Sequence, residues 1–175
     1  MSARRLLLLV LVLAAGAGGA SAGGLLDPES DEQPAGDDGA GGAVGRVVKV
    51  VDGDTIHVQV GGMREKVRYI GVDTPETKHP SKGVECFGQK ASDFNARLVG
   101  GEQVRLVRDV QERDRYGRLL AYVHRVRDGL FVNAELARRG YAHPLSIPPD
   151  VRHAERFERL AREAREHDRG LWAAC

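Results

Sequence analysis

Several groups of residues that define familiar enzyme classes are missing from these 175 residues. There are only two cysteines and no cluster of histidines near either, which excludes a structural zinc site because such sites need four ligands at close, paired spacings. The six histidines are scattered without ligand spacing, and no glycine-rich phosphate-binding loop is present. Zinc sites and nucleoside triphosphatases therefore find no support in this sequence.

The first 42 residues differ in composition from the rest. Residues 1–22 have the features of a secretory signal: a basic start at Arg4 and Arg5, a run of apolar residues too short to span a bilayer, and a small-residue cleavage site ending at Ala22. An uncleaved anchor is the alternative. Residues 23–42 contain glycine, alanine and acids, which predicts a disordered tether. We expect one domain over residues 43–175, a monomer that is secreted or held in the cell envelope without stable membrane association.

The charge and the cysteines also divide unevenly along the chain. Two of the 26 basic residues and six of the 25 acids precede residue 43, so the expected domain has a net charge of +5, which suits a polyanionic partner. Both cysteines, Cys86 and Cys175, lie in this domain. In an exported protein an even pair favours a disulfide, with two free thiols as the alternative.

Hydrophobic periodicity predicts a domain of strands followed by helices. Residues 55–60 alternate between apolar and polar, and Gly61-Gly62 then indicates a hairpin turn. The expected strands are residues 46–51, 55–60, 65–72, 103–108 and 119–125, and the expected helices are residues 86–99, 132–139 and 151–168. We interpret this string as an α+β, mainly β fold, a five-stranded Greek-key barrel of the oligonucleotide-binding (OB) type with about three helices. An α+β sandwich fits the same string.

Acidic residues that suit a hard metal ion follow two of these strands. Asp52 and Asp54 flank Gly53, and Asp73 begins a loop in which Thr74 precedes a proline. Two carboxylates and the Thr74 carbonyl are hard oxygen ligands, which favour Ca²⁺ or Mg²⁺ over zinc or copper. Each segment could also be an ordinary turn with incidental acids.

Two arginines and a glutamate complete a set that phosphodiester cleavage requires. Arg68 lies within an otherwise apolar strand, and Arg118 precedes another strand. Two guanidiniums can hold a phosphate and stabilise its five-coordinate transition state. Glu76 is the candidate general base. The alternative for Arg68 is an edge-strand arginine whose stem packs along the surface.

These motifs, taken together and in order, resemble the staphylococcal nuclease (thermonuclease) family. The resemblance rests on Val-Asp-Gly-Asp-Thr at 51–55, Arg68 with Val-Asp-Thr-Pro-Glu-Thr at 72–77, Lys-His-Pro at 78–80, Gly-Val-Glu at 83–85 and Asp-Arg-Tyr-Gly-Arg-Leu-Leu-Ala-Tyr at 114–122. It covers residues 47–172 and implies a five-stranded OB barrel with three helices. It also implies a Ca²⁺-dependent nuclease that acts on DNA and RNA and leaves 3′-phosphate ends.

The resemblance also implies a role for each site residue. Calcium ligands would be Asp54, Asp73 and the Thr74 carbonyl, with Asp52 as a further acid near the metal. The implied catalytic residues are Arg68, Glu76 and Arg118, and Lys82 and Tyr116 would lie near the bound nucleotide.

This chain departs from the family at a pair of tyrosines that pack against the terminal nucleotide, because Ser146 and Pro148 occupy the matching positions. Stacking on an aromatic ring contributes about 1–3 kcal/mol per base. We therefore expect weaker nucleotide binding, or stacking supplied by Tyr116 or Tyr141. The rival function is a nucleic-acid-binding module without catalysis, and a structural calcium-binding domain is a third possibility that would not need the two arginines.

Overall fold

The structure is a computed structural model that describes residues 41–77 and 83–175. The expected signal at 1–22, most of the expected tether and Lys82 lie outside the described residues. Five strands form a closed barrel in the order β1-β2-β3-β6-β5, with β3 and β6 parallel and every other neighbouring pair antiparallel. The OB-type barrel and the α+β class are confirmed.

The barrel strands follow the expected alternation closely. They are β1 (Ala43–Val50), β2 (Thr55–Val60), β3 (Met63–Tyr69), β5 (Gln103–Val107) and β6 (Leu119–Arg125). On β2, Ile56 and Val58 are fully buried, while His57 and Gln59 point away from the core. The β2–β3 hairpin turns through Gly61 and Gly62, whose φ angles of 53° and 85° suit a tight two-residue turn of the primed type.

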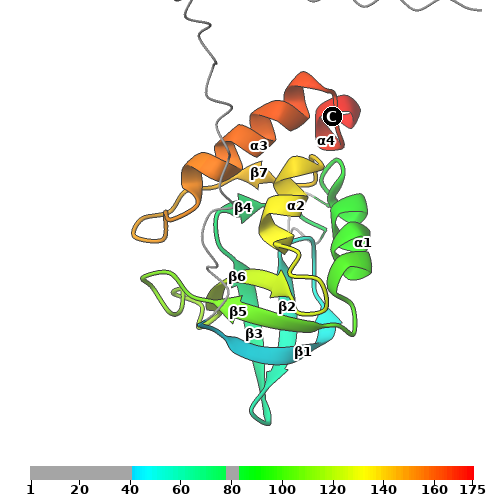
Figure 1. The fold of residues 1–175 in the computed structure, drawn as a ribbon. Coiled ribbons are helices and arrows are strands. Elements are labelled where there is room, and N and C mark those ends of the chain that lie inside the picture. The colour runs from blue at the N-terminus through cyan, green and yellow to red at the C-terminus, as the bar shows by residue number, and fades with distance from the viewer. Residues whose placement is uncertain (1–40, 78–82) are drawn as a thin grey trace, which may run out of the picture. The chain divides into compact units, whose positions relative to one another are not determined.

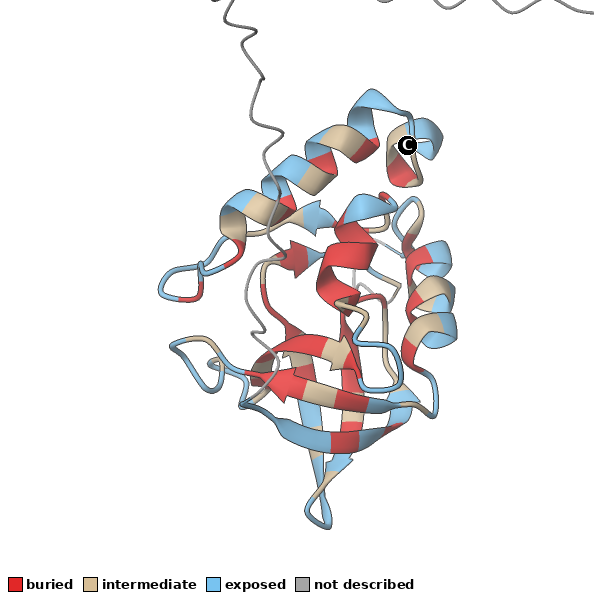
Figure 2. Ribbon diagram, viewed as in Figure 1, coloured by how far each residue is buried: buried red, intermediate tan, exposed pale blue. Residues whose placement is uncertain are grey.

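The helices cover one end of the barrel and stack above it (Figure 1). They are α1 (Gly88–Val99), α2 (Val132–Arg138), α3 (Ala154–Glu166) and the single turn α4 (Leu171–Ala174). Helix α2 is buried along almost its whole length, whereas α1 and α3 each bury one face (Figure 2). Among the described residues, no helix combines the length and apolar character that crossing a bilayer requires.

The third strand ends earlier than the sequence predicts. It stops at Tyr69 because Gly71 adopts a left-handed φ of 81° and turns the chain. A side chain at Gly71 would lie 2.2 Å from a ring carbon of Phe157, so the turn is packed directly against α3. The next residues form β4 (Val72–Asp73), which pairs with β7 (His143–Pro144) in a separate two-stranded sheet.

Two helices begin later than expected, each for a local reason. Phe87 takes a left-handed φ of 70°, so α1 starts at Gly88 rather than at Cys86. Helix α3 starts at Ala154 rather than at Val151, because the preceding residues form a turn in which the Ala154 N–H donates to the Val151 carbonyl at 3.0 Å.

Candidate active site

Asp54 lies directly before β2 and is almost fully buried, with 5% of its surface exposed. Its Oδ2 accepts hydrogen bonds from the backbone N–H of Thr74 at 2.8 Å and from the Thr74 hydroxyl at 3.0 Å. The Thr55 hydroxyl donates to its Oδ1 at 3.1 Å. These contacts fix the carboxylate against the start of the loop that follows β4.

Arg68 joins two of the predicted metal ligands through its guanidinium. One terminal nitrogen lies 3.1 Å from Asp54 Oδ2, and the other donates to Asp73 Oδ1 at 2.7 Å. The first nitrogen also donates to the carbonyls of Tyr69 at 3.1 Å and Val72 at 2.8 Å. A guanidinium has five N–H donors. Within residues 41–77 and 83–175, its Nε–H and one N–H of the second nitrogen have no protein acceptor, so they remain available to a ligand.

Negative charge exceeds positive charge around this arginine. Burial and the neighbouring Asp54 carboxylate raise the pKa of Asp52 to about 6. Burial also raises the pKa of Asp73, as does Asp54, against the opposing effect of Arg68. The pKa of Glu76 is raised by burial and by Asp54 and Asp73. The four acids therefore repel one another, and an added cation would relieve that repulsion.

The oxygen atoms of Asp54, Asp73 and Thr74 suit a hard cation that takes only a few of its ligands from the protein. Asp54 and Asp73 already converge on one positive group, and among the described residues no hydrogen-bond donor contacts the Thr74 carbonyl oxygen. In the described part of the chain no cluster of three or more His, Cys, Asp or Glu side chains forms a metal site. Two carboxylates and one carbonyl would leave several positions around Ca²⁺ to water and phosphate oxygens, because this ion takes six to eight ligands.

Arg118 is held by Asp114, four residues earlier. Its Nε donates to Asp114 Oδ2 at 2.6 Å, and its backbone N–H donates to Asp114 Oδ1 at 3.0 Å. The guanidinium also lies 5.4 Å from the centre of the Tyr116 ring. Because Asp114 engages only Nε, the terminal nitrogens of Arg118 have no acceptor among the described residues.

A cavity of about 490 Å³ joins the two arginines. Its lining includes Arg68, Tyr116, Arg118, Leu145 and Ile147. Asp114, Arg115 and Asp150 line the cavity as well, so the two guanidiniums face a space of mixed charge whose remaining lining is mainly apolar. A larger cavity of about 910 Å³, beside the Glu65–Arg113 ion pair, contains none of the predicted site residues.

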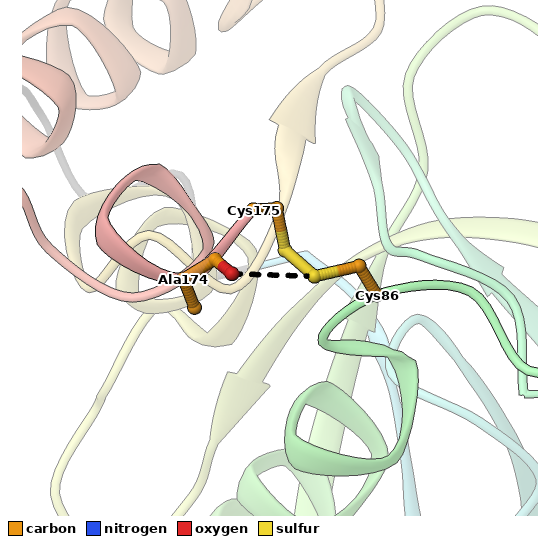
Figure 3. The surroundings of a disulfide bond; sticks show 3 residues. All are labelled: Cys86, Ala174 and Cys175. Carbon is orange, nitrogen blue, oxygen red and sulfur yellow. Dashed lines mark hydrogen bonds between the residues drawn. A yellow bond between two sulfur atoms is a disulfide. The ribbon is translucent and has the colours of Figure 1, made fainter.

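Glu76 does not line the cavity, and a disulfide-anchored loop holds its backbone. Its N–H donates to Glu85 Oε2 at 3.0 Å, and its carbonyl accepts from the Glu85 N–H at 2.9 Å. Cys86, which directly follows Glu85, forms a disulfide with Cys175, as expected (Figure 3). Its sulfur also lies 3.6 Å from the Ala174 carbonyl oxygen, which is a contact rather than a hydrogen bond because a disulfide sulfur carries no proton.

The segment that lacks the tyrosine pair borders the cavity. Leu145 and Ile147 line it on either side of Ser146, and Ile147 is 60% exposed. Of the two substitute rings, Tyr116 lies at the cavity and is 67% exposed, whereas Tyr141 stacks on Phe94 with ring centres 4.0 Å apart. Tyr116 therefore presents an exposed ring at the cavity, with the guanidiniums of Arg115 and Arg118 lying 4.8 and 5.4 Å from its centre, and Tyr141 packs within the fold.

The sequence pattern assigned no role to the residues that position the site, although Thr55, Glu85 and Asp114 lie in the quoted motifs. These residues act through hydrogen bonds to the predicted ones, and they are Thr55, Glu85, Asn95 and Asp114. Asn95 is fully buried on α1, donates to the Asp52 carbonyl at 3.0 Å and accepts from the Tyr69 hydroxyl at 3.0 Å. An asparagine within an apolar helical stripe was the available signal, since a buried amide needs polar partners.

Comparison with known proteins gives a consistent result. A family model described as "Staphylococcal nuclease homologue" matches residues 66–174. A thermonuclease of Staphylococcus hyicus is 41% identical over 128 residues, which cover 73% of this chain and 75% of that protein. A thermonuclease of Staphylococcus intermedius is 40% identical over 126 residues, covering 72% and 74%. Endonuclease YncB of Bacillus subtilis is 38% identical over 127 residues, covering 71% and 59%.

Proposed function

The chain belongs to the staphylococcal nuclease family, and from that membership we propose that it is a Ca²⁺-dependent nuclease that hydrolyses phosphodiester bonds of DNA and RNA. The observation that carries this proposal is the shared cavity of Arg68 and Arg118 beside the Asp54 and Asp73 carboxylates. Two guanidiniums with unused N–H groups suit a phosphate. The two carboxylates already converge on the Arg68 guanidinium, and such a pair also suits a metal ion.

In the proposed mechanism each residue has one task. Asp54, Asp73 and the Thr74 carbonyl would hold Ca²⁺, which when bound would neutralise charge on the scissile phosphate. Arg68 and Arg118 would donate N–H groups to the phosphate oxygens and stabilise the extra negative charge of the transition state. Glu76 would accept a proton from the attacking water. The water oxygen then bonds to phosphorus as the bond from phosphorus to the 5′-oxygen breaks, the leaving oxygen takes a proton from solvent water, and a 3′-phosphate end remains.

A nucleic-acid-binding module without catalysis would not need this arrangement. Burying charged groups such as Asp54 and Arg68 costs several kcal/mol of desolvation that a surface ion pair avoids. Simple phosphate binding could be met by exposed cations alone. The retained acids and arginines therefore favour the enzyme.

Hydrolysis of single-stranded DNA tests the proposal. We expect cleavage with Ca²⁺, none with chelator, and a loss of at least about 100-fold in kcat/KM for Arg118→Ala, because a preorganised donor to the transition state is removed. Arg159→Ala is the matched control, since Arg159 is an exposed arginine of α3 outside the cavity. Equal rates for wild type and Arg118→Ala, or cleavage that chelator does not affect, would refute the mechanism.

Calcium binding tests the ligand set separately. We expect Asp54→Asn to weaken Ca²⁺ binding in titration calorimetry by more than the roughly 10- to 100-fold that loss of a residue hydrogen-bonded to a ligand costs. Glu65→Gln is the control, because Glu65 is a carboxylate paired with Arg113 outside the candidate site. Unchanged affinity in Asp54→Asn would remove Asp54 from the ligand set.

We also propose that residues 1–22 direct export and are then removed. The basic start, short apolar run and Ala20-Ser21-Ala22 support this proposal. N-terminal sequencing of protein recovered from the culture medium should begin after Ala22. Protein that retains Met1 and stays in the cell would contradict it.

A further inference from the structure

The charged side chains on the outer surface of β1, β2 and β3 are all positive. Because inward residues such as Val47, Ile56, Val58 and Val67 are buried in the core, their neighbours point outward. The strand register aligns these outward positions in two rows across the three strands: Arg46, Gln59 and Arg64, then Lys49, His57 and Lys66. We call Arg46, Lys49, Arg64 and Lys66 the outer cationic face, and all four are exposed.

No acid neutralises this face within the described residues. None of the four cations forms an ion pair there, and neither row contains a carboxylate. The one acid of β3 is Glu65, which lies opposite the buried Val58 and pairs with Arg113 at 2.9 Å. Strand alternation therefore directs Glu65 away from the face and leaves only positive charge on it.

The cations lie close enough to act together. Besides burial, the charges of Arg64, Lys49 and Lys66 lower the pKa of His57, which stands between the two lysines. Neighbouring strands are about 4.8 Å apart, so Lys49 and Lys66 are separated by about 10 Å at the backbone. Like charges about 10 Å apart repel each other at low ionic strength, where the Debye length exceeds that distance. Binding of an anion would offset the repulsion among these cations and would explain why the face contains no acid.

The face continues into the candidate active site. Arg64, Lys66 and Arg68 alternate along β3, so their side chains leave the same side of the strand. Arg64 lies about 13 Å from Arg68 along the strand, with Lys66 between them. A polyanion held at Arg68 therefore meets two further cations in line.

We propose that the outer cationic face binds the phosphate backbone of the nucleic-acid strand that extends from the scissile phosphate. The inference rests on the proposed nuclease function and adds a second binding surface to it. In oligonucleotide-binding barrels the face of the second and third strands is a common site for oligonucleotides. Apart from His57, the two rows contain no aromatic side chain, so contacts here are mainly electrostatic and largely independent of base sequence.

The salt dependence of binding tests the proposal. Affinity for a long labelled oligothymidylate would be measured by fluorescence anisotropy, with chelator present so that the strand stays intact. Each lost phosphate contact lowers the slope of log affinity against log salt by about 0.7 for a single strand. For Arg64→Gln/Lys66→Gln we expect a slope smaller by about 1.4, so that its affinity deficit is roughly sevenfold larger at 50 mM than at 200 mM salt.

The matched control is Arg159→Gln/Arg162→Gln, which removes the same net charge from exposed positions on α3. We expect this variant to keep the wild-type slope. A slope for Arg64→Gln/Lys66→Gln equal to that of wild type, or an equal reduction in the control, would overturn the proposal. Thermal unfolding provides the folding check, and because like charges are removed the melting temperature should not fall.

Cleavage kinetics separate this inference from the function on which it rests. A dinucleotide has one internucleotide phosphate, which the active site must hold, whereas a long strand also reaches Lys66 and Arg64. We expect the ratio of kcat/KM for long strand over dinucleotide to fall in Arg64→Gln/Lys66→Gln and to hold in the control. If wild type cleaves both substrates and the ratio does not fall, the proposed binding at the cationic face is refuted while the nuclease proposal stands. If wild type cleaves neither, the nuclease proposal fails.

Discussion

Removal of the Cys86–Cys175 disulfide should cost the protein much of its stability. The bond joins residues 89 positions apart, and it connects the start of α1 to the last residue of the chain. In the chain-entropy model a closed loop of that length destabilises the unfolded state by about 4.6 kcal/mol at 25 °C. Both cysteines are exposed, so serine at either position leaves no cavity in the core.

The size of the thermal shift follows from the size of the domain. Unfolding entropy is about 2.1 cal/mol/K per residue, so a domain of roughly 130 residues should lose about 17 °C in Tm when 4.6 kcal/mol is removed. Urea unfolding and calorimetry of wild type and Cys86→Ser/Cys175→Ser would measure both quantities. We expect wild type in reductant to match the double variant.

A thiol-labelling assay on unfolded, unreduced protein must first find no free cysteine. With the bond confirmed in this way, a loss of less than about 1 kcal/mol would refute the argument, because the entropic effect of so long a loop would then be absent. Activity provides a second measurement. Cys86 follows Glu85, which holds the backbone of Glu76, so kcat should fall with the bond removed.

Three further predictions concern the packing and hydrogen bonds of the domain. Asn95→Ala should lower the free energy of unfolding by about 3 kcal/mol, because it breaks two buried hydrogen bonds and leaves the Tyr69 hydroxyl unpaired. Urea unfolding would measure the change, and a loss below about 1 kcal/mol would contradict the prediction. Gly71→Ala should cost at least about 2 kcal/mol, because a left-handed backbone and a 2.2 Å clash combine, whereas Gly129→Ala, left-handed but unobstructed, should cost only about 1. The hydrogen bond from Arg125 lowers the pKa of Asp128 from 3.8 to about 2, so its stabilisation is complete above pH 3.8 and disappears as the pH falls through 2. The Tm difference between wild type and Asp128→Asn should shrink over that range, and a constant difference would exclude the linkage.

Local sequence patterns predicted the barrel well. Strands β2 and β6 begin and end at the predicted residues, because alternating side chains and flanking turns are encoded within a few positions. The end of β3 could not be predicted in the same way. It depends on the contact of Gly71 with Phe157 and on the pairing of Val72 with Pro144, and both join residues far apart in the chain.

For the candidate site, too, local patterns predicted the residues, but they did not predict the contacts that depend on the fold. Residue types and spacing identified Asp54, Arg68 and Asp73, yet they assigned the arginine to phosphate alone. The structure shows that Arg68 also bridges the two acids, which requires β2, β3 and the loop after β4 to meet. The predicted roles of these residues and of Lys82 remain predictions.

The outer cationic face shows why composition alone misleads. The segment Met-Arg-Glu-Lys-Val-Arg at residues 63–68 contains mixed charge, and a net charge of +5 gives no location. A strand directs alternate residues to opposite sides, so Glu65 faces one way and Arg64, Lys66 and Arg68 face the other. A helix over the same residues would mix these charges on one surface, since neighbours three and four apart share a face. The single-signed surface is therefore a product of the strand assignment, and a strand-register shift of one residue would abolish it.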